Sequence, residues 1–141
     1  MGAQVINRRH LIAGAAGSAA LLLTRPALAA AATPVEDELR VSPVRTTTLF
    51  AWRPAVSRGT VVFSHGHGSW PARYEALAAR LTAAGWNVVA PVHVDSMRYP
   101  DRAKFTMQAS FGERIADLNA AIAGVPAEQP VVLVGHSFGT L

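Results

Sequence analysis

Apolar and branched side chains are concentrated in four short segments, and longer stretches with a different spacing separate these segments. The four segments are 44–52, 60–63, 86–90 and 131–134. Threonine, aromatic and branched residues favour a strand in the first segment. The short apolar runs of the other three are typical of strands that are covered on both faces. Four strands are therefore predicted.

Two longer segments show the spacing of helices with one buried face. Between Pro71 and Ala84, apolar side chains recur at intervals of three and four residues: Tyr74, Leu77, Ala78 and Leu81. A second stripe, from about Thr106 to Ala123, is formed by Phe111, Ile115, Leu118 and Ile122. A glycine directly follows each segment, which favours termination of a helix at that point.

Strands that alternate with single helices predict right-handed βαβ units. The expected fold is therefore of the α/β class, with a parallel sheet flanked by helices. In open sheets of this kind, chemistry gathers at the carboxyl ends of the strands. Two glycine-rich motifs occupy such positions: His65-Gly66-His67-Gly68 after the second predicted strand, and Gly135-His136-Ser137-Phe138-Gly139 after the last.

Residues 1–29 have the organisation of an export signal, so the protein is expected in the periplasm or outside the cell. The paired Arg8-Arg9, the apolar stretch Leu11 to Leu23 and the small-residue cleavage pattern Ala27-Leu28-Ala29 follow one another. The two arginines favour recognition by the twin-arginine export machinery over the ordinary secretory route. The apolar stretch is shorter than the roughly 20 residues of a membrane-spanning helix, so no stable anchor is expected after cleavage.

The segment 30–43 carries the acidic cluster Glu36-Asp37-Glu38 and is predicted to be a solvated leader, followed by the folded unit 44–141. The net charge of +4 comes largely from three arginines in the signal, so the remaining chain is close to neutral. Without a basic stripe, nucleic-acid binding has no support. The chain contains no cysteine, which excludes disulfides and thiol chemistry.

Ser137 lies in a GxSxG pattern directly after the last predicted strand. A tight turn from strand to helix holds such a serine in a strained conformation with its hydroxyl above the sheet. Gly135 and Gly139 remove the side chains that would collide as strand and helix approach each other. This context favours a nucleophile at Ser137 over an ordinary strand-to-helix turn.

Acyl transfer generates an oxyanion, which backbone N–H groups already in place can stabilise. The candidates are the N–H groups of His67, in the loop after the second predicted strand, and of Phe138, directly after the serine. His136 is interpreted as a hydrogen-bonding residue rather than as the catalytic base, because a base must reach the serine hydroxyl from another loop.

A metal site is the competing interpretation of the histidine-rich loop. His65, His67, His93 and Asp95 would supply four ligands at strand ends. The sequence Gly68-Ser69-Trp70 stands where an Asp-His pair usually follows in metal hydrolases with a His-x-His motif. Neither Asp95 nor Asp101 is a convincing acid for a catalytic triad, and Asp117 is predicted on the exposed side of its helix.

With these motifs in their order, the chain resembles the amino-terminal part of the α/β-hydrolase superfamily, most closely its branch of dienelactone hydrolases, acetylhydrolases and chlorophyllase-like esterases. The resemblance covers about Val44 to Leu141. It implies that Ser137 is the nucleophile and that His67 and Phe138 form the oxyanion hole. It also implies that a carboxylic ester or related small acyl substrate is hydrolysed through an acyl-enzyme, with no cofactor.

In this superfamily the catalytic acid and histidine follow later strands, which the chain does not contain. The chain is therefore expected to be an incomplete and inactive part of a longer serine hydrolase, truncated after the serine turn. In the superfamily's strand order the last strand would then have an open, apolar edge. A non-enzymatic exported remnant or interaction module is the alternative.

Overall fold

The computed structural model describes residues 33–140, so the predicted export signal lies outside the described residues. One sheet contains five strands: β1 (Val35–Ser42), β2 (Arg45–Trp52), β3 (Thr60–Ser64), β4 (Asn87–Pro91) and β5 (Val131–Gly135). The helices are α1 (Glu75–Ala83) and α2 (Phe111–Ala123), with short 3₁₀ turns η1 (Pro71–Tyr74) and η2 (Ser137–Gly139). All four predicted strands and both predicted helices are present.

The strands lie in the order β1-β2-β4-β3-β5. β3 pairs in parallel with β4 and with β5, whereas β2 pairs antiparallel with both β1 and β4. The sheet is therefore mixed: β4, β3 and β5 form the predicted parallel part, and β1 and β2 add an antiparallel part on one side. The reason is the short β1–β2 hairpin, which adds to the edge of β4 without a crossover helix.

The strand β1 corrects the prediction that residues 30–43 form a solvated leader, because it spans most of that segment. Leu39 is its only buried residue, and the acidic cluster projects from an otherwise exposed strand. Backbone pairing with β2, from Val35 opposite Ala51 onward, holds β1 in place. Val35, Leu39 and Val41 lie at alternate positions, but Asp37 interrupts this pattern, and the charges of the strand suit the edge of a sheet.

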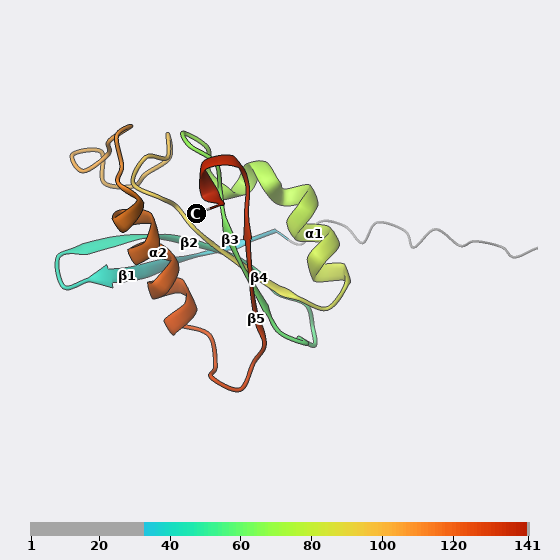
Figure 1. The fold of residues 1–141 in the computed structure, drawn as a ribbon. Helices are drawn as coiled ribbons and strands as arrows, with labels where there is room; N and C mark the ends of the chain where they lie inside the picture. The colour runs from blue at the N-terminus through green and yellow to red at the C-terminus, as the bar shows by residue number, and fades with distance from the viewer. Residues whose placement is uncertain (1–32, 141) are drawn as a thin grey trace, which may run out of the picture.

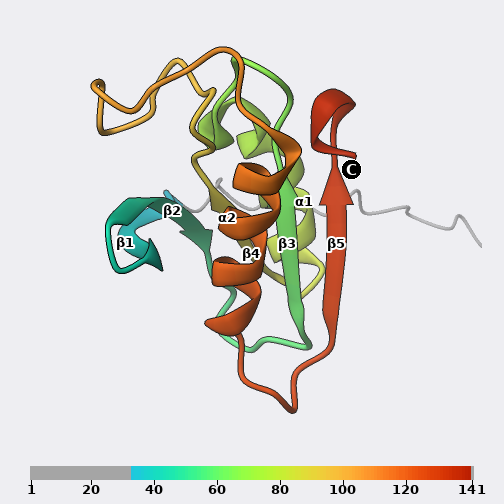
Figure 2. The same cartoon turned by 60° about the vertical axis from the view of Figure 1, so that its left-hand side comes forward.

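The two helices cover opposite faces of the sheet, with α2 crossing in front and α1 behind in Figure 2. The connection from β3 to β4 runs one way across the sheet, and the connection from β4 to β5 returns past β3. Crossovers of one handedness therefore place their helices on opposite faces. This reversal also brings the carboxyl ends of β3 and β5 side by side (Figure 1).

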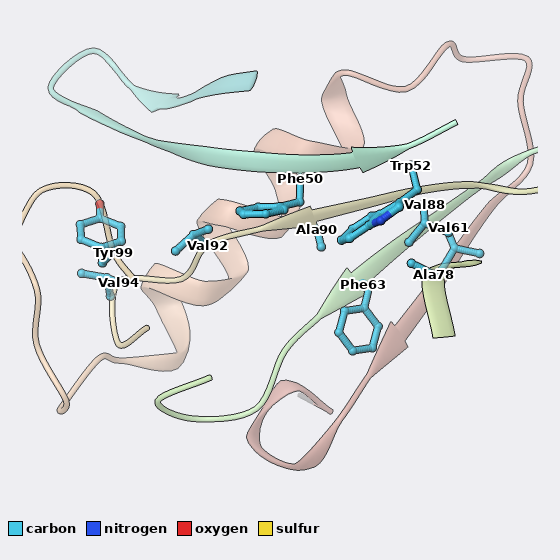
Figure 3. Packing of buried hydrophobic residues seen from close by; sticks show 10 residues of the cluster. All are labelled: Phe50, Trp52, Val61, Phe63, Ala78, Val88, Ala90, Val92, Val94 and Tyr99. Atoms are coloured by element: carbon cyan, nitrogen blue, oxygen red, sulfur yellow. The ribbon is translucent and has the colours of Figure 1, made fainter. Parts of the chain in front are cut away.

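Alternate residues of the central strand serve two separate cores. Val61 and Phe63 join the larger core with Ala78 of α1, which also includes the aromatic pair Phe50 and Trp52 (Figure 3). Val62 packs on the other face in a smaller core with Leu39 and Ala121, the last of these on α2. Burial of both faces of β3 explains the uninterrupted apolar run of this strand.

Helix α2 begins later than predicted because Ser110 and Glu113 form a capping box, in which the Ser110 side chain accepts from the Glu113 N–H. Its buried face also differs from the predicted apolar stripe. The buried residues are Arg114, Asp117 and Ala121, whereas Phe111 is 53% exposed. Two charged side chains take the place expected for apolar ones because each is paired with an opposite charge.

β5 forms the open edge of the sheet beyond β3, as expected from the resemblance. Its side chains Val131, Val132 and Leu133 are 40%, 41% and 61% exposed. An apolar strand with an unpaired edge is a site for association with further chain. Among residues 33–140, no helix has the length and apolar character to cross a membrane.

Candidate active site

Ser137 follows β5 in a backbone conformation that side chains rarely adopt, with φ of 55°. Within residues 33–140 it is the only residue other than glycine with positive φ. Gly135 and Gly139 make the turn sterically feasible. A Cβ on Gly135 would collide with the Gly139 carbonyl, and a Cβ on Gly139 would collide with the Ser64 carbonyl. The sequence motif therefore corresponds to a strained turn that admits only glycine at both flanking positions.

The histidine-rich loop lies directly against this turn. Ser64 and Gly135 are paired at the ends of β3 and β5, and the His136 N–H donates to the Ser64 carbonyl at 3.1 Å. A Cβ added to Gly66 would lie 3.5 Å from the Cβ of Ser137. Glycine at this position lets the loop backbone approach the serine closely.

An open cleft of about 370 Å³ is lined by residues of both the loop and the serine turn, and its walls include Gly66, His67, Arg73, Tyr74, His136 and Ser137. The backbone N–H groups of His67 and Phe138 donate no hydrogen bond to another group of the described chain. The serine turn and the histidine-rich loop therefore offer a serine hydroxyl and two unoccupied backbone donors. These are the groups that stabilise a tetrahedral oxyanion when they converge on it.

Tyr74 connects the two sides of the cleft. The Gly66 N–H donates to its hydroxyl oxygen at 3.2 Å, and the hydroxyl lies 2.9 Å from Nδ1 of His136. This contact agrees with the interpretation of His136 as a hydrogen-bonding residue. No histidine ring in residues 33–140 forms a hydrogen bond with the hydroxyl of Ser137.

The four candidate metal ligands do not form a metal site in the structure. His65 donates from Nδ1 to the Gly66 carbonyl at 2.8 Å, and its Nε2 accepts from the His93 N–H at 3.1 Å. His67 instead binds Asp95 through Nδ1. Across the described residues 33–140, no group of three or more His, Cys, Asp or Glu side chains could hold an ion. The metal interpretation therefore has no structural support.

Burial, with a smaller contribution from the neighbouring His93, lowers the pKa of His65 to about 3. Both ring nitrogens of neutral His65 are already occupied, one as donor and one as acceptor. A second proton would therefore remove the bond from the His93 N–H. His65 is a buried neutral element that ties the end of β3 to the chain following β4.

A second group of buried polar side chains surrounds His93. His93 contacts Asp117 through Nδ1 at 2.9 Å and Ser64 through Nε2 at 3.1 Å, and Arg45 pairs with Asp117 at 2.6 Å. Burial lowers the pKa of His93, although Asp117 partly opposes that change. The Ser-His-Asp series resembles a catalytic triad in composition, but its side chains are buried and substrate cannot reach them. The prediction of an exposed Asp117 is wrong.

In the sequence, Asp95 is a candidate only as a metal ligand or triad acid, and its pairing with Arg114 is not predicted. The Arg114 Nη2 donates to both carboxylate oxygens of Asp95, at 3.0 and 2.8 Å, and both side chains are fully buried. Burial raises the pKa of Asp95, but Arg114 and His67 outweigh that effect, so the net pKa is lowered. Asp95 is therefore a carboxylate that accepts from Nδ1–H of His67 at 2.8 Å. The only sequence signal was a pair of charged residues, Arg114 and Asp117, at helical spacing.

The described sheet, with helices on both faces and a strained serine turn at the end of a parallel strand, matches part of the α/β-hydrolase fold. Residues 55–141 match the family model described as serine aminopeptidase, S33 (Hydrolase_4). The chain belongs to this family. Several of the similar solved structures are named as lipases or esterases.

Three similar solved structures illustrate the match. A lipase in its open form has 26% identity and a TM-score of 0.63, with 75% of this chain and 37% of that chain covered. The thioesterase domain from the curacin biosynthetic pathway has 27% identity and a TM-score of 0.62, with 75% and 38% covered. A monoglyceride lipase from Saccharomyces cerevisiae shares the fold at 21% identity and a TM-score of 0.57, with 75% and 34% covered. The chain thus spans well under half the length of these proteins. A comparison with curated proteins found no match.

Proposed function

We propose that the chain is the amino-terminal part of a serine hydrolase that cleaves a carboxylic ester or a related acyl bond. Ser137 is the nucleophile, and the backbone N–H groups of His67 and Phe138 stabilise the oxyanion. The observation that carries the proposal is the strained backbone of Ser137, which shares a cleft with His67, together with the unoccupied N–H groups of His67 and Phe138. A conformation with this cost persists where function requires it.

In the proposed reaction, the Ser137 oxygen attacks the acyl carbon while a base takes the hydroxyl proton. The negative carbonyl oxygen is held by the two N–H groups, and the alcohol departs with that proton to leave an acyl-enzyme. Water then attacks the acyl-enzyme by the same steps, releasing the acid and restoring the serine. The turn and the donors are in residues 33–140, and the base and its orienting acid are expected further along a longer chain.

The proposal of a longer chain is supported by the surface beside β5. A groove of about 290 Å³ lies between α2 and β5, with Val62, Leu118 and Leu133 among its walls. The strand edge next to it is unpaired. We assign the following segment of the same protein to this surface, as a helix on the groove and a strand on the edge. The chain as given is then inactive because Ser137 has no base.

Expression of Ala30 to Leu141 tests this assignment. The exposed edge is expected to produce a self-associating protein without a cooperative unfolding transition. A monodisperse chain that unfolds cooperatively in urea would contradict the assignment. The nucleotide sequence after the codon for Leu141 is a further test, since an in-frame continuation with an acid and then a histidine at strand ends is expected.

A fluorophosphonate tests the nucleophile, because this reagent labels only an activated serine. The longer protein is expected to be labelled and to hydrolyse short p-nitrophenyl esters, whereas Ser137→Ala abolishes both. Ser42→Ala, a change at the end of β1, is the matched control and should leave both unchanged. Absence of labelling in every form of the protein would favour the alternative of a non-enzymatic remnant or interaction module.

The substrate class, the branch of the superfamily and the export of the protein are also proposed. Similarity to proteins named as lipases and a thioesterase supports a small acyl substrate. The branch of dienelactone hydrolases and acetylhydrolases is supported only by the sequence resemblance.

We propose that the twin-arginine machinery exports the protein to the periplasm or beyond. The double variant Arg8→Lys with Arg9→Lys is therefore expected to block export. Normal export of that double variant would contradict the route.

A further inference from the structure

A buried ion pair contacts both the histidine-rich loop and the serine turn. Arg114 and Asp95 are each 0% exposed, and the guanidinium donates to both carboxylate oxygens. Arg114 comes from α2, whereas Asp95 follows β4, so neither belongs to the histidine loop or to the serine turn. Burial of such a pair is weak evidence of added stability, because the cost of removing two charges from water offsets their attraction.

The pair holds the histidine loop at two points, one on each side of Gly66. The Arg114 Nη1 donates to the carbonyl oxygen of His65 at 2.9 Å. Asp95 accepts from the imidazole of His67 at 2.8 Å. The backbone between these points includes the N–H of His67, whose direction therefore depends on the ion pair.

The same guanidinium also reaches the serine turn. Its carbon lies 5.0 Å from the centre of the Phe138 ring, a distance at which a cation is attracted to an aromatic face. The Phe138 ring stacks on Phe111 and meets the His67 imidazole edge-on, at 4.9 and 5.6 Å between ring centres. One buried cation thus contacts the Phe138 ring directly and is connected to His67 through Asp95.

We propose that Arg114 and Asp95 are positioning residues that hold the N–H groups of His67 and Phe138 at the separation required by the oxyanion. This inference rests on the proposed function. The pair does not touch substrate, and it acts through the His65 carbonyl, the His67 imidazole and the Phe138 ring. An N–H donor stabilises the transition state only if it already points at the developing charge. A small displacement therefore reduces the stabilisation of the transition state more than it reduces the binding of the substrate.

The expected effect is a loss of kcat with little change in KM. Complete removal of one oxyanion donor typically costs about 100- to 1000-fold in kcat. A displaced donor keeps part of its effect, so Arg114→Met and Asp95→Asn are each expected to lower kcat by about 10- to 100-fold. Arg114→Lys retains the charge but has no second nitrogen with which to bind Asp95 and the His65 carbonyl separately, so it should restore activity only in part.

The experiment uses the longer protein in which Ser137 labelling is measured. Arg114→Met and Asp95→Asn are compared with wild type for kcat and KM on a p-nitrophenyl ester and for inhibition by a trifluoromethyl ketone, which forms an oxyanion on the serine. Arg45→Met is the matched control, because it also breaks a buried ion pair with α2 but has no contact with the loop. Asp95→Asn preserves side-chain volume and provides the second test if Arg114→Met fails to fold.

We expect the affinity for the trifluoromethyl ketone to fall in proportion to kcat/KM in Arg114→Met and Asp95→Asn. The control Arg45→Met should lose stability but keep its kcat. Hydrogen exchange of the 65–68 amides should accelerate in Arg114→Met and not in the control. An unchanged kcat in a folded Asp95→Asn or Arg114→Met protein would overturn the positioning role and leave the proposed function intact. A wild-type protein with neither labelling nor ester hydrolysis would overturn both proposals.

Discussion

The buried His65 predicts that the protein loses stability on mild acidification. In the folded state, burial and the neighbouring His93 lower the pKa of His65 to about 3, from a usual value of 6.5. Below pH 6.5, His65 therefore binds a proton in the unfolded chain but not in the folded protein. Since the unfolded state binds more protons, stability falls as pH falls, from about pH 6.5 down to about pH 3.

The magnitude follows from these two pKa values. At pH 5 most of the unfolded population carries the proton on His65, whereas the folded population does not, which costs about 2 kcal/mol. The structural reason is that neutral His65 already donates to the Gly66 carbonyl and accepts from the His93 N–H. His93 adds to the effect in the same direction, since its pKa is also lowered. The buried carboxylate Asp95 does not contribute at pH 5, because its lowered pKa affects stability only below its ordinary value of 3.8.

Urea denaturation of the longer protein at pH 7 and pH 5 measures this effect. Wild type should lose at least about 2 kcal/mol of unfolding free energy between the two values. The variant His65→Gln has no titrating group and should lose about 2 kcal/mol less, although it is less stable at pH 7. Parallel losses in wild type and variant would refute the assignment of a low pKa to His65.

Three further predictions concern the turn, the helix cap and the sheet edge. Gly139→Ala places a Cβ against the Ser64 carbonyl, so urea denaturation should show a loss of about 3 kcal/mol or more. Ser110→Ala removes the capping box of α2 and should lower the thermal midpoint by an amount equivalent to about 1 kcal/mol, an effect that Ser110→Asp would largely avoid. Leu133→Lys adds a charge to a side chain that is 61% exposed beside the open edge, so light scattering should show less association of the isolated chain 30–141. Equal scattering from the two chains would contradict the role of that edge.

Much of the sheet was predictable because its central strands are covered on both faces. The apolar run around Val61 follows from that covering, and the run around Val132 belongs to the strand next to it. Helix α1 follows from the spacing of its apolar side chains. The hairpin strand β1 escaped detection because backbone pairing rather than burial defines it. The serine turn was predictable as a local motif, since the collisions at Gly135 and Gly139 involve residues close in sequence or on the adjacent strand.

The buried charges were not predictable in the same way. A charged residue on a helix is ordinarily placed toward solvent, and Asp117 was predicted there. Its partners Arg45 and His93 lie on other elements, as does the partner of Arg114. Only the folded chain shows that these charges cancel one another in the interior.

The sequence by itself determined the α/β class, the order of the strands and helices after β1, and the position of Ser137 after β5, because hydrophobic periodicity and glycine sterics act over short distances. The tertiary structure decided which side chains surround that serine. The Arg114–Asp95 pair joins residues from α2 and the chain after β4 to the loop after β3. Contacts between elements distant in sequence depend on the sheet order and helix faces, which local patterns do not encode.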